Sequence, residues 1–153
     1  MPRTLTATER EQFLAQPHIG VISVANDTET DGDRPPLTVP VWYAYEPGGD
    51  LTFFTGTQGR TARKARLLER AGKLSFCVQR PTYPYKYVTV ECVVARADRS
   101  PTRDQVYAVT SRYLPEEAAR GFAEAETAHP SGTFVLFTAR PERWLSSDFG
   151  DTP

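Results

Sequence analysis

The chain has 153 residues, 39% of them hydrophobic, which is enough to bury the core of one domain. Its net charge of −1 at pH 7 argues against a general electrostatic attraction to nucleic acid. No apolar run reaches the ~20 residues of a membrane-spanning helix, and the opening Met-Pro-Arg-Thr-Leu-Thr contains no signal-peptide core. We therefore expect one domain over residues 1–153, in a cytoplasmic protein that binds neither membranes nor nucleic acid.

The first part of the chain predicts one short helix followed by strands and turns. Thr6 and Glu9 have the spacing of a capping box, which starts a helix that should end near Ala15. Apolar runs then predict strands at 18–24, 37–45 and 51–55, with an exposed loop at 26–36. Pro40 has no N–H to donate, so it marks an edge, a bulge or a ligand-facing break in the second strand.

Residues 55–70 carry the clearest functional signal. A strand breaks at Thr55 and Gly56, and good helix formers follow until Gly72. The free N–H groups and the dipole of a helix start favour an anion. Four cations that could bind a phosphate fall within seven residues: Arg60, Arg63, Lys64 and Arg66. We interpret this segment as a phosphate-anchoring loop for a phosphorylated cofactor, the alternative being a solvated basic helix face.

The second part of the chain predicts further strands at 73–79, 87–97, 133–139 and 142–145. Ser100 and Pro101 have the signature of a helix start. The residues expected to face inward on this helix and on a second one at 115–125 are Val106, Val109, Tyr113, Ala118, Ala119 and Phe122. Strands joined by short turns favour an α+β fold that is mainly β, a six- to seven-stranded antiparallel barrel with peripheral helices.

The cysteines and histidines do not suggest a metal site. Cys77 and Cys92 both lie in apolar runs, which is typical of buried, reduced thiols. The remaining candidate ligands of this kind are His18 and His129, so we expect no zinc site. The sequence also lacks a Gly-x-Gly-x-x-Gly motif and a Walker loop, which argues against the commonest nucleotide-binding folds.

Several short motifs, taken in order, resemble one family. They are Val39-Pro-Val-Trp42, Phe53-Phe-Thr55 with the Arg63-Lys64 helix start, Tyr87-Val-Thr-Val-Glu91, and Pro141-Glu-Arg-Trp144. Together they resemble the split-barrel flavin-binding proteins related to pyridoxamine 5′-phosphate oxidase, and more closely the actinobacterial branch that uses flavin or deazaflavin. The resemblance covers residues 19–145.

The resemblance implies a homodimeric oxidoreductase with a flavin-type cofactor at the subunit interface. Such an enzyme would pass hydride to or from a small unsaturated organic molecule, and the bound cofactor would carry out the chemistry. The phosphate falls on Arg63 and Lys64, with Arg60 and the hydroxyls of Thr55 and Thr61 nearby. The other implied cofactor contacts are Pro40, Val41 and Trp42 along the ring, Gln79 as a hydrogen-bond partner, and Trp144 reaching the site of the partner subunit. The alternatives are that Trp42 and Trp144 are core aromatics and that Gln79 faces solvent.

The sequence departs from that of the oxidases themselves at two points, and these departures limit which cofactor and which substrate we expect. No Arg or Lys occurs between Pro35 and Gly59, where the oxidases carry both as phosphate ligands. Arg143-Trp-Leu-Ser-Ser-Asp148 also does not match their substrate residues. Pyridoxamine phosphate is therefore not the expected substrate. The deazaflavin F-420 is favoured over FMN, because Arg60 and Arg66 suit its long anionic tail.

The acid–base residue and several alternatives stay open. Tyr83, Tyr85 and Tyr87 could stack on a substrate or donate a proton near the expected mouth of the site, or be buried for structural reasons. The protein could also be a carrier or sensor without turnover. Two further alternatives are a single-stranded nucleic-acid module using these tyrosines and a haem protein using His18 or His129.

Overall fold

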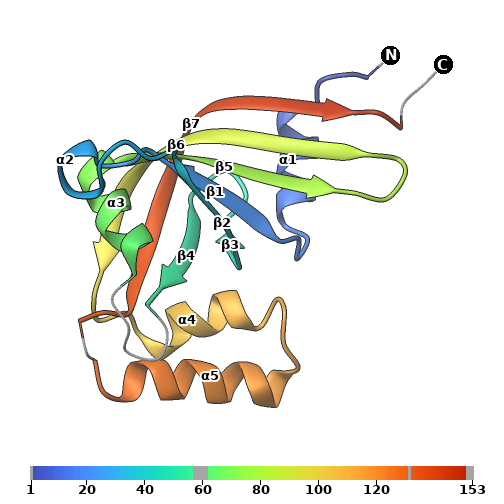
Figure 1. Ribbon diagram of the computed structural model, residues 1–153. Coiled ribbons are helices and arrows are strands. Elements are labelled where there is room, and N and C mark those ends of the chain that lie inside the picture. Colours follow the sequence, from blue (N-terminus) through green and yellow to red (C-terminus); the bar gives the residue numbers. More distant parts are fainter. Residues whose placement is uncertain (1, 57–61, 131, 151–153) are drawn as a thin grey trace.

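The computed structural model describes residues 2–56, 62–130 and 132–150 (Figure 1). The strands are β1 (Gly20–Val24), β2 (Leu37–Val41), β3 (Ala44–Tyr45), β4 (Leu51–Thr55), β5 (Lys73–Arg80), β6 (Lys86–Asp98) and β7 (Val135–Asp148). The helices are α1 (Ala7–Leu14), α2 (Thr28–Asp31), α3 (Arg63–Ala71), α4 (Arg103–Thr110) and α5 (Glu116–Ala128). The strands form one antiparallel sheet of seven in the described residues, so the predicted mainly β architecture is confirmed.

The order of the strands forces the sheet to close on itself. The order is β2-β1-β5-β6-β7-β4-β3, so β2 and β3 are the two edges of the sheet. Only Trp42 and Tyr43 separate these two strands in the chain. The link from Val41 to Ala44 spans at most about 11 Å. The two edges must therefore lie near each other, and the sheet is a split barrel rather than an open layer.

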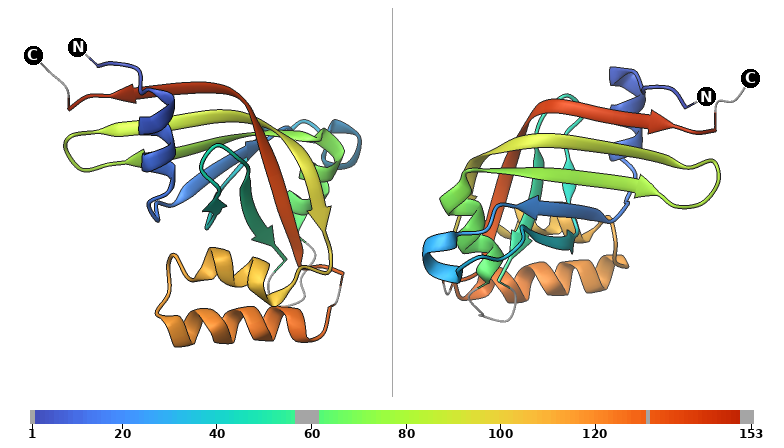
Figure 2. Two further views of the ribbon diagram at one scale, coloured as in Figure 1. Left: turned by 180° about the vertical axis from the view of Figure 1, so that it is seen from behind. Right: turned by 45° about the horizontal axis from the view of Figure 1, so that its top comes forward.

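The two long strands, β6 and β7, are bent along their length and take part in both halves of the barrel (Figure 2). The pairing of β6 with β7 shifts register between Glu91 and Cys92 and again between Val94 and Arg96, and such bulges increase bending and twist. The predicted strands at 133–139 and 142–145 are one continuous strand, β7, which corrects that prediction. Pro141 is tolerated inside this strand because it lies beside a register shift.

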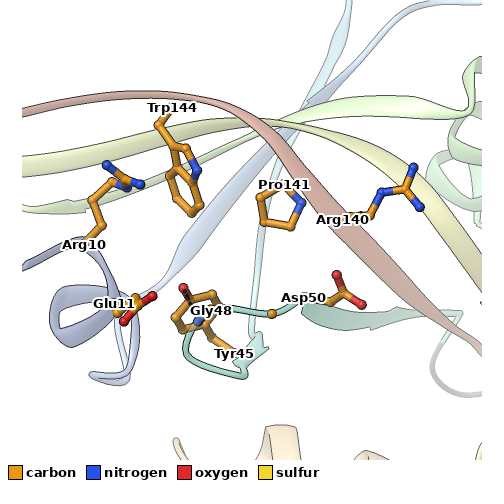
Figure 3. A pocket seen from close by; sticks show the side chains of 9 residues that line it. Arg10, Glu11, Tyr45, Gly48, Asp50, Arg140, Pro141 and Trp144 are labelled. Atoms are coloured by element: carbon orange, nitrogen blue, oxygen red, sulfur yellow. Dashed lines mark hydrogen bonds between the residues drawn. The ribbon is translucent and has the colours of Figure 1, made fainter. Parts of the chain in front are cut away.

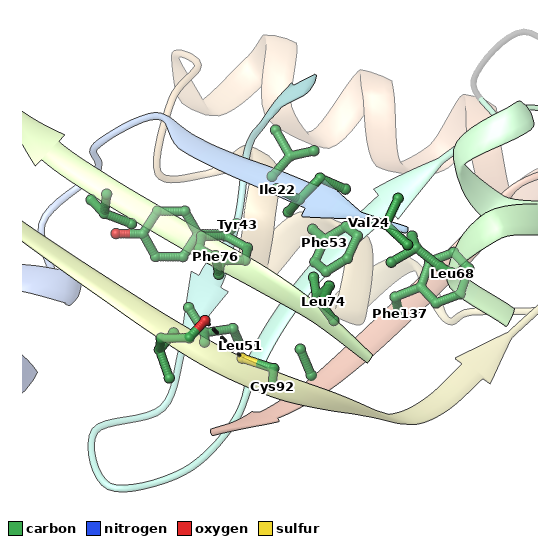
Figure 4. Packing of buried hydrophobic residues seen from close by; sticks show 14 of the residues in the cluster. Ile22, Val24, Tyr43, Leu51, Phe53, Leu68, Leu74, Phe76, Cys92 and Phe137 are labelled. Atoms are coloured by element: carbon green, nitrogen blue, oxygen red, sulfur yellow. Dashed lines mark hydrogen bonds between the residues drawn. The ribbon is translucent and has the colours of Figure 1, made fainter. Parts of the chain in front are cut away.

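The core lies inside the barrel, where alternate side chains of the strands meet (Figure 4). Among the largest fully buried side chains are Tyr43, Phe53, Phe76 and Phe137. Phe76 contacts Tyr43 edge-on, with ring centroids 5.3 Å apart. The Tyr43 hydroxyl donates to the Leu14 carbonyl oxygen at 2.9 Å, which connects the link between the sheet edges to the end of α1.

Local signals place α1 and α3 as predicted. The Thr6 side chain accepts from the Glu9 backbone N–H and the Glu9 side chain accepts from the Thr6 N–H, so the capping box is confirmed. Helix α3 buries Leu67 and Leu68 and packs against β1, β5 and β6. It ends at Gly72, which has a φ of 68°, in the left-handed region that glycine adopts without strain.

The two helices between β6 and β7 lie side by side as an antiparallel pair below the sheet (Figure 1). Helix α4 is capped by Thr102 with Gln105, and not by Ser100 as predicted, because these two residues form a complete capping box. On α5 the predicted inward positions Ala119 and Phe122 are confirmed, whereas Ala118 is exposed and Ala123 is buried instead, which corrects that position.

The loop between β1 and β2 also differs from the prediction. It contains the short helix α2, capped by the Asp27 side chain, which accepts from the Glu29 N–H at 3.1 Å. Asp27 is 5% exposed, so part of the loop predicted as exposed is buried. Its acidic residues face α3.

Other expectations concern the cysteines, membranes and metals. Cys77 and Cys92 are free thiols, as predicted, but only Cys92 is fully buried, and this burial raises its pKa to about 12.

None of the helices in the described parts of the chain is both long and apolar enough to cross a membrane. The described residues also contain no cluster of His, Cys, Asp or Glu placed to hold a metal ion.

The packing of β1 against the core gives a test of the fold. We expect Gly20→Ala to lower the free energy of unfolding by about 1–3 kcal/mol, because its Cβ would lie 2.4 Å from Cε1 of the buried Phe76. Gly121→Ala on α5 is the control. A Cβ there meets nothing within 4 Å, so this change should raise stability by about 0.5–1 kcal/mol. Urea denaturation measures both, and an unchanged midpoint for Gly20→Ala would contradict the packing.

Candidate functional site

A cleft of about 480 Å³ opens between the β2 end, the β4 end and the first turn of α3. We call it the Lys64 cleft, and its lining residues are Ile19, Pro40, Val41, Trp42, Phe54, Thr55, Gly56 and Lys64. Sequence analysis predicted five of these as cofactor contacts, from three separate segments: Pro40, Val41, Trp42, Thr55 and Lys64. Of these five predicted residues, Pro40 and Lys64 are 24 positions apart in the sequence, and the fold brings both to the Lys64 cleft.

Backbone geometry explains how these segments meet. Pro40 lies in β2, an edge strand, and pairs with Val21, so its missing N–H removes no bond from a central ladder. At the other side β4 ends with Thr55, and Gly56 has a φ of 82° that lets the chain turn away from the sheet. Lys64 then projects from the second position of α3.

One end of the cleft is polar. Thr55 is 1% exposed, and its hydroxyl has no hydrogen-bond partner within the described residues. Lys64 likewise has no acidic partner in that part of the chain, and burial lowers its pKa. The first N–H groups of α3 lack acceptors inside the helix, and Ala62 at the N-cap offers no side-chain oxygen. Because unpaired buried polar groups are unfavourable, this end is suited to an anion.

The opposite wall of the cleft is apolar and held in place by aromatic contacts. Trp42 stacks on Tyr113, with ring centroids 5.1 Å apart and planes 8° from parallel. The Tyr113 hydroxyl donates to the His18 carbonyl oxygen at 2.7 Å, which fixes the tyrosine. Phe54 packs against Phe122 of α5. The helix pair thus supports the wall of the cleft, a role that the helical face pattern of the sequence did not reveal.

Arg63 and Arg66 point away from this cleft and bind acids of the β1–β2 loop. Arg63 Nε lies 3.0 Å from Asp31 Oδ2, and its Nη2 donates to Asn26 Oδ1 at 2.7 Å. Arg66 Nη2 lies 2.9 Å from Asp31 Oδ1. Hydrogen bonds from Arg66 and Arg63 lower the pKa of Asp31.

The same pattern continues along α3. Arg70 Nε lies 3.1 Å from Asp27 Oδ1, and its Nη2 lies 3.4 Å from Glu29 Oε2. We call these contacts the α2–α3 network, formed by Asp27, Glu29, Asp31, Arg63, Arg66 and Arg70. The basic face of α3 is therefore largely paired within the chain. The alternation of acids at 27, 29 and 31 is the sequence signal that could have indicated it.

Other predicted site residues lie elsewhere. Gln79 is exposed and accepts from the Tyr85 hydroxyl at 3.1 Å, and it does not line the Lys64 cleft. Tyr83 is 81% exposed, so the alternative of structural burial is wrong for this tyrosine. Arg60 and Thr61 lie outside the described residues.

Trp144 lines a separate cavity of about 410 Å³ between α1, the turn after β3 and β7 (Figure 3). The Arg10 guanidinium lies over its ring, 4.5 Å from the centroid. This cavity shares no lining residue with the Lys64 cleft, so Trp144 does not complete the cleft of its own chain.

The haem alternative finds little support at either histidine. His18 stacks on Phe13 with centroids 4.4 Å apart, and its Nε2 lies 3.0 Å from Gln16 Oε1. Burial, and then the charges of three nearby basic residues (Arg80, Arg112 and Lys86), lower its pKa. His129 is exposed at the end of α5.

Comparison with solved structures identifies the fold. A protein named F420 reductase superimposes with a TM-score of 0.65 at 22% identity, covering 88% of this chain and 94% of its own. A FAD-binding protein from Mesorhizobium loti gives 0.63 at 23% identity, covering 96% of each chain. A conserved hypothetical protein from Mycobacterium tuberculosis gives 0.71 at 20% identity, covering 95% of this chain and 86% of its own.

These likenesses confirm the predicted fold, which this chain shares with proteins named F420 reductase, FAD-binding protein and putative pyridoxamine 5′-phosphate oxidase. No protein-family model matches the sequence, and no curated protein matches it either. At the identities found, the structural likeness establishes the fold alone.

The different surroundings of two adjacent cations give a test of the site. Arg63→Ala should lower the free energy of unfolding by about 1–2 kcal/mol, because it removes contacts with Asp31 and Asn26 in a partly buried network. Lys64→Ala should change it by less than about 0.5 kcal/mol, because no acid in the described residues pairs with this ammonium. Chemical denaturation compares them, and equal losses would contradict the assignment.

Proposed function

We propose that the protein is an oxidoreductase that binds a phosphorylated flavin-type cofactor, F-420 or FMN, in the Lys64 cleft. It would transfer hydride to or from a small unsaturated organic substrate. The observation that carries this proposal is the pairing of an aromatic wall, with Trp42 and Phe54, and an anion-binding end, with Thr55 and Lys64, in one cleft. A ring system with a charged tail matches these two ends. The likeness to proteins named F420 reductase and FAD-binding protein supports the same class of ligand.

The residues of the cleft fit such a group. The Lys64 ammonium and the first N–H groups of α3 would hold the phosphate, and the orphaned Thr55 hydroxyl would donate to it. Pro40, Val41 and Trp42 would contact the ring and exclude water from it. The bound cofactor supplies hydride transfer, while the protein orients it. Arg60 and Thr61 remain predicted contributors, whereas the Nε and Nη2 of Arg63 are engaged by Asp31 and Asn26.

F-420 remains the favoured cofactor. The segment between Pro35 and Gly59 contributes no Lys or Arg, so the strand side of the cleft adds no second cation for a phosphate. Among the described lining residues, Lys64 is the single basic side chain. A phosphate held as in the oxidases would need the additional ligands. We therefore do not expect pyridoxamine phosphate oxidase activity.

We further propose that two copies of the chain pair through the outer face of the sheet. Register pairing places Pro40 beside Val21, Val21 beside Cys77, Cys77 beside Thr89, and Thr89 beside Leu145, so these five side chains form one row across five strands. Leu145 is 62% exposed at one end, and Ile19 near the other is 47% exposed. Because Pro40 and Ile19 also line the Lys64 cleft, a second copy on this face would cover the cleft as well.

A specific observation keeps a carrier or sensor as the second candidate. Within the described residues, no His, Asp, Glu, Cys or Tyr lines the Lys64 cleft, so acid–base help there is limited to Lys64. Reduction assays with F-420H₂ or NADPH-reduced FMN against enones and quinones separate the two candidates. Turnover supports the enzyme, and tight binding without turnover supports the carrier.

The dimer gives a testable consequence. We expect Leu145→Glu to convert a wild-type dimer into monomers, because it introduces a charge into the apolar row at an exposed position. Tyr83→Ser, at another exposed aromatic on the β5–β6 loop, is the control and should leave the dimer intact. Light scattering after size exclusion measures the masses. A monomeric wild-type protein would rule out the pairing.

Cofactor binding gives the direct test of the proposed function. Wild-type protein should bind F-420 or FMN, and Lys64→Ala should weaken binding about tenfold or more, since a hydrogen bond to a charged group contributes about 1.5–3 kcal/mol. Lys73→Ala is the matched control, because Lys73 is exposed on β5 and does not line the cleft. Isothermal titration calorimetry measures each affinity. Equal affinities in wild type and Lys64→Ala would place the anchor elsewhere.

A further inference from the structure

The Asp31 carboxylate lies between two arginines of α3. Its Oδ2 is 3.0 Å from Arg63 Nε, and both of its oxygens are 2.9 Å from Arg66 Nη2. The Asp31 side chain is 12% exposed and that of Arg63 is 22% exposed, so solvent screens this contact only in part. One carboxylate thus compensates charge on both guanidinium groups.

The network as a whole is close to neutral. Asp27 is 5% exposed, and its oxygens lie 3.1 Å from Arg70 Nε and 3.8 Å from Arg66 Nη1. Glu29 adds a third acid, which contacts Arg70. Three carboxylates therefore face three guanidinium groups. Lys64, on the same helix, has no such partner in the described residues and lines the cleft.

We propose that Asp31 sets the charge of the anion that the Lys64 cleft accepts, favouring a singly charged group such as a phosphodiester over a doubly charged phosphomonoester. The proposal rests on the proposed function, because it requires an anionic group seated at Lys64. Among the described residues of α3, a second negative charge on the ligand would find its partner in Arg63 or Arg66. Either would have to leave Asp31, and a partly buried carboxylate without its partner is unfavourable.

In this proposal Asp31 also contributes one like charge toward the ligand, and its loss leaves the network with one uncompensated positive charge. Hydrogen bonds from Arg66 and Arg63 lower its pKa, so it is ionised at neutral pH. Arg63 directly precedes Lys64, so the carboxylate that binds Arg63 also lies near the start of α3. Repulsion between Asp31 and a ligand grows with the charge of the ligand, and a doubly charged group feels it twice as strongly.

The experiment compares FMN with its 5′-monomethyl phosphate ester, which has the same ring and side chain but a phosphodiester. A phosphomonoester loses its second proton near a pKa of about 6, so at pH 7.5 FMN carries two charges and the ester carries one. Quenching of flavin fluorescence gives the dissociation constants for wild type and Asp31→Asn. We expect Asp31→Asn to improve FMN binding about threefold to tenfold more than it improves binding of the ester.

The matched control is Asp33→Asn, which removes the same charge from an exposed position of the same loop. It should leave the ratio of the two affinities at the wild-type value. Arg60, outside the described residues, is common to every protein compared, so the change in ratio isolates the effect of Asp31. Circular dichroism confirms that each variant is folded.

The outcomes separate the two proposals. An unchanged ratio in Asp31→Asn overturns the role of Asp31, and so does a change of equal size in Asp33→Asn. If wild type binds F-420 while neither it nor Asp31→Asn binds FMN, the role of Asp31 is also overturned, since its removal should admit the doubly charged group. Failure of wild type to bind F-420, FMN and the ester alike overturns the proposed function itself.

Discussion

The two-residue link between the edges of the sheet is the constraint on which the rest of the structure depends. Trp42 and Tyr43 must carry the chain from β2 to β3, at opposite ends of the strand order. Tyr43 points into the core, where it is fully buried against Phe76. Its neighbour Trp42 therefore faces the opposite way and stacks on Tyr113 beside the cleft. Closing the barrel and building the aromatic wall of the site are thus consequences of one pair of residues.

Charge pairing decides what the basic helix can do. An arginine on a helix surface could bind solvent, an acid of its own chain or a ligand. Which of these it binds depends on how deeply the possible acidic partners are buried. Asp27 and Asp31 are only 5% and 12% exposed in their side chains, so leaving either without a partner is more unfavourable than for acids in bulk water. The arginines of α3 accordingly form ion pairs with the acids at α2. Among the described residues, Lys64 is left as the cation that lines the cleft, and its ammonium, held partly out of water, is stabilised by an anion.

Much of the fold could be predicted from short-range patterns, because capping boxes and glycine C-caps act within a few residues. Thr6 with Glu9, and Gly72, are examples. Competing local signals misled the prediction at Ser100, where a better capping box lies two residues on. The Arg63–Asp31 contact joins residues 32 positions apart, and the alternating acids at 27, 29 and 31 indicate a basic partner without identifying α3 as that partner. For the same reason the sequence placed Pro40 and Lys64 in one site only through a family resemblance. Gln79 lies away from the cleft, and the reach of Trp144 into a partner's site stays a prediction.

The open side of the cleft connects its chemistry to the outer face of the sheet. Hydride transfer from a reduced ring requires that water be kept away, and a cleft with exposed Pro40 and Ile19 on its rim does not achieve this alone. The apolar row from Pro40 to Leu145 begins at the same rim. A surface that covered the row would both bury exposed apolar area and close the cleft, so the proposed dimer and the proposed hydride transfer would depend on the same contact. In the proposed arrangement the anion-binding end needs no such cover, because the buried Thr55 hydroxyl of β4 and the first-turn N–H groups of α3 come from one chain.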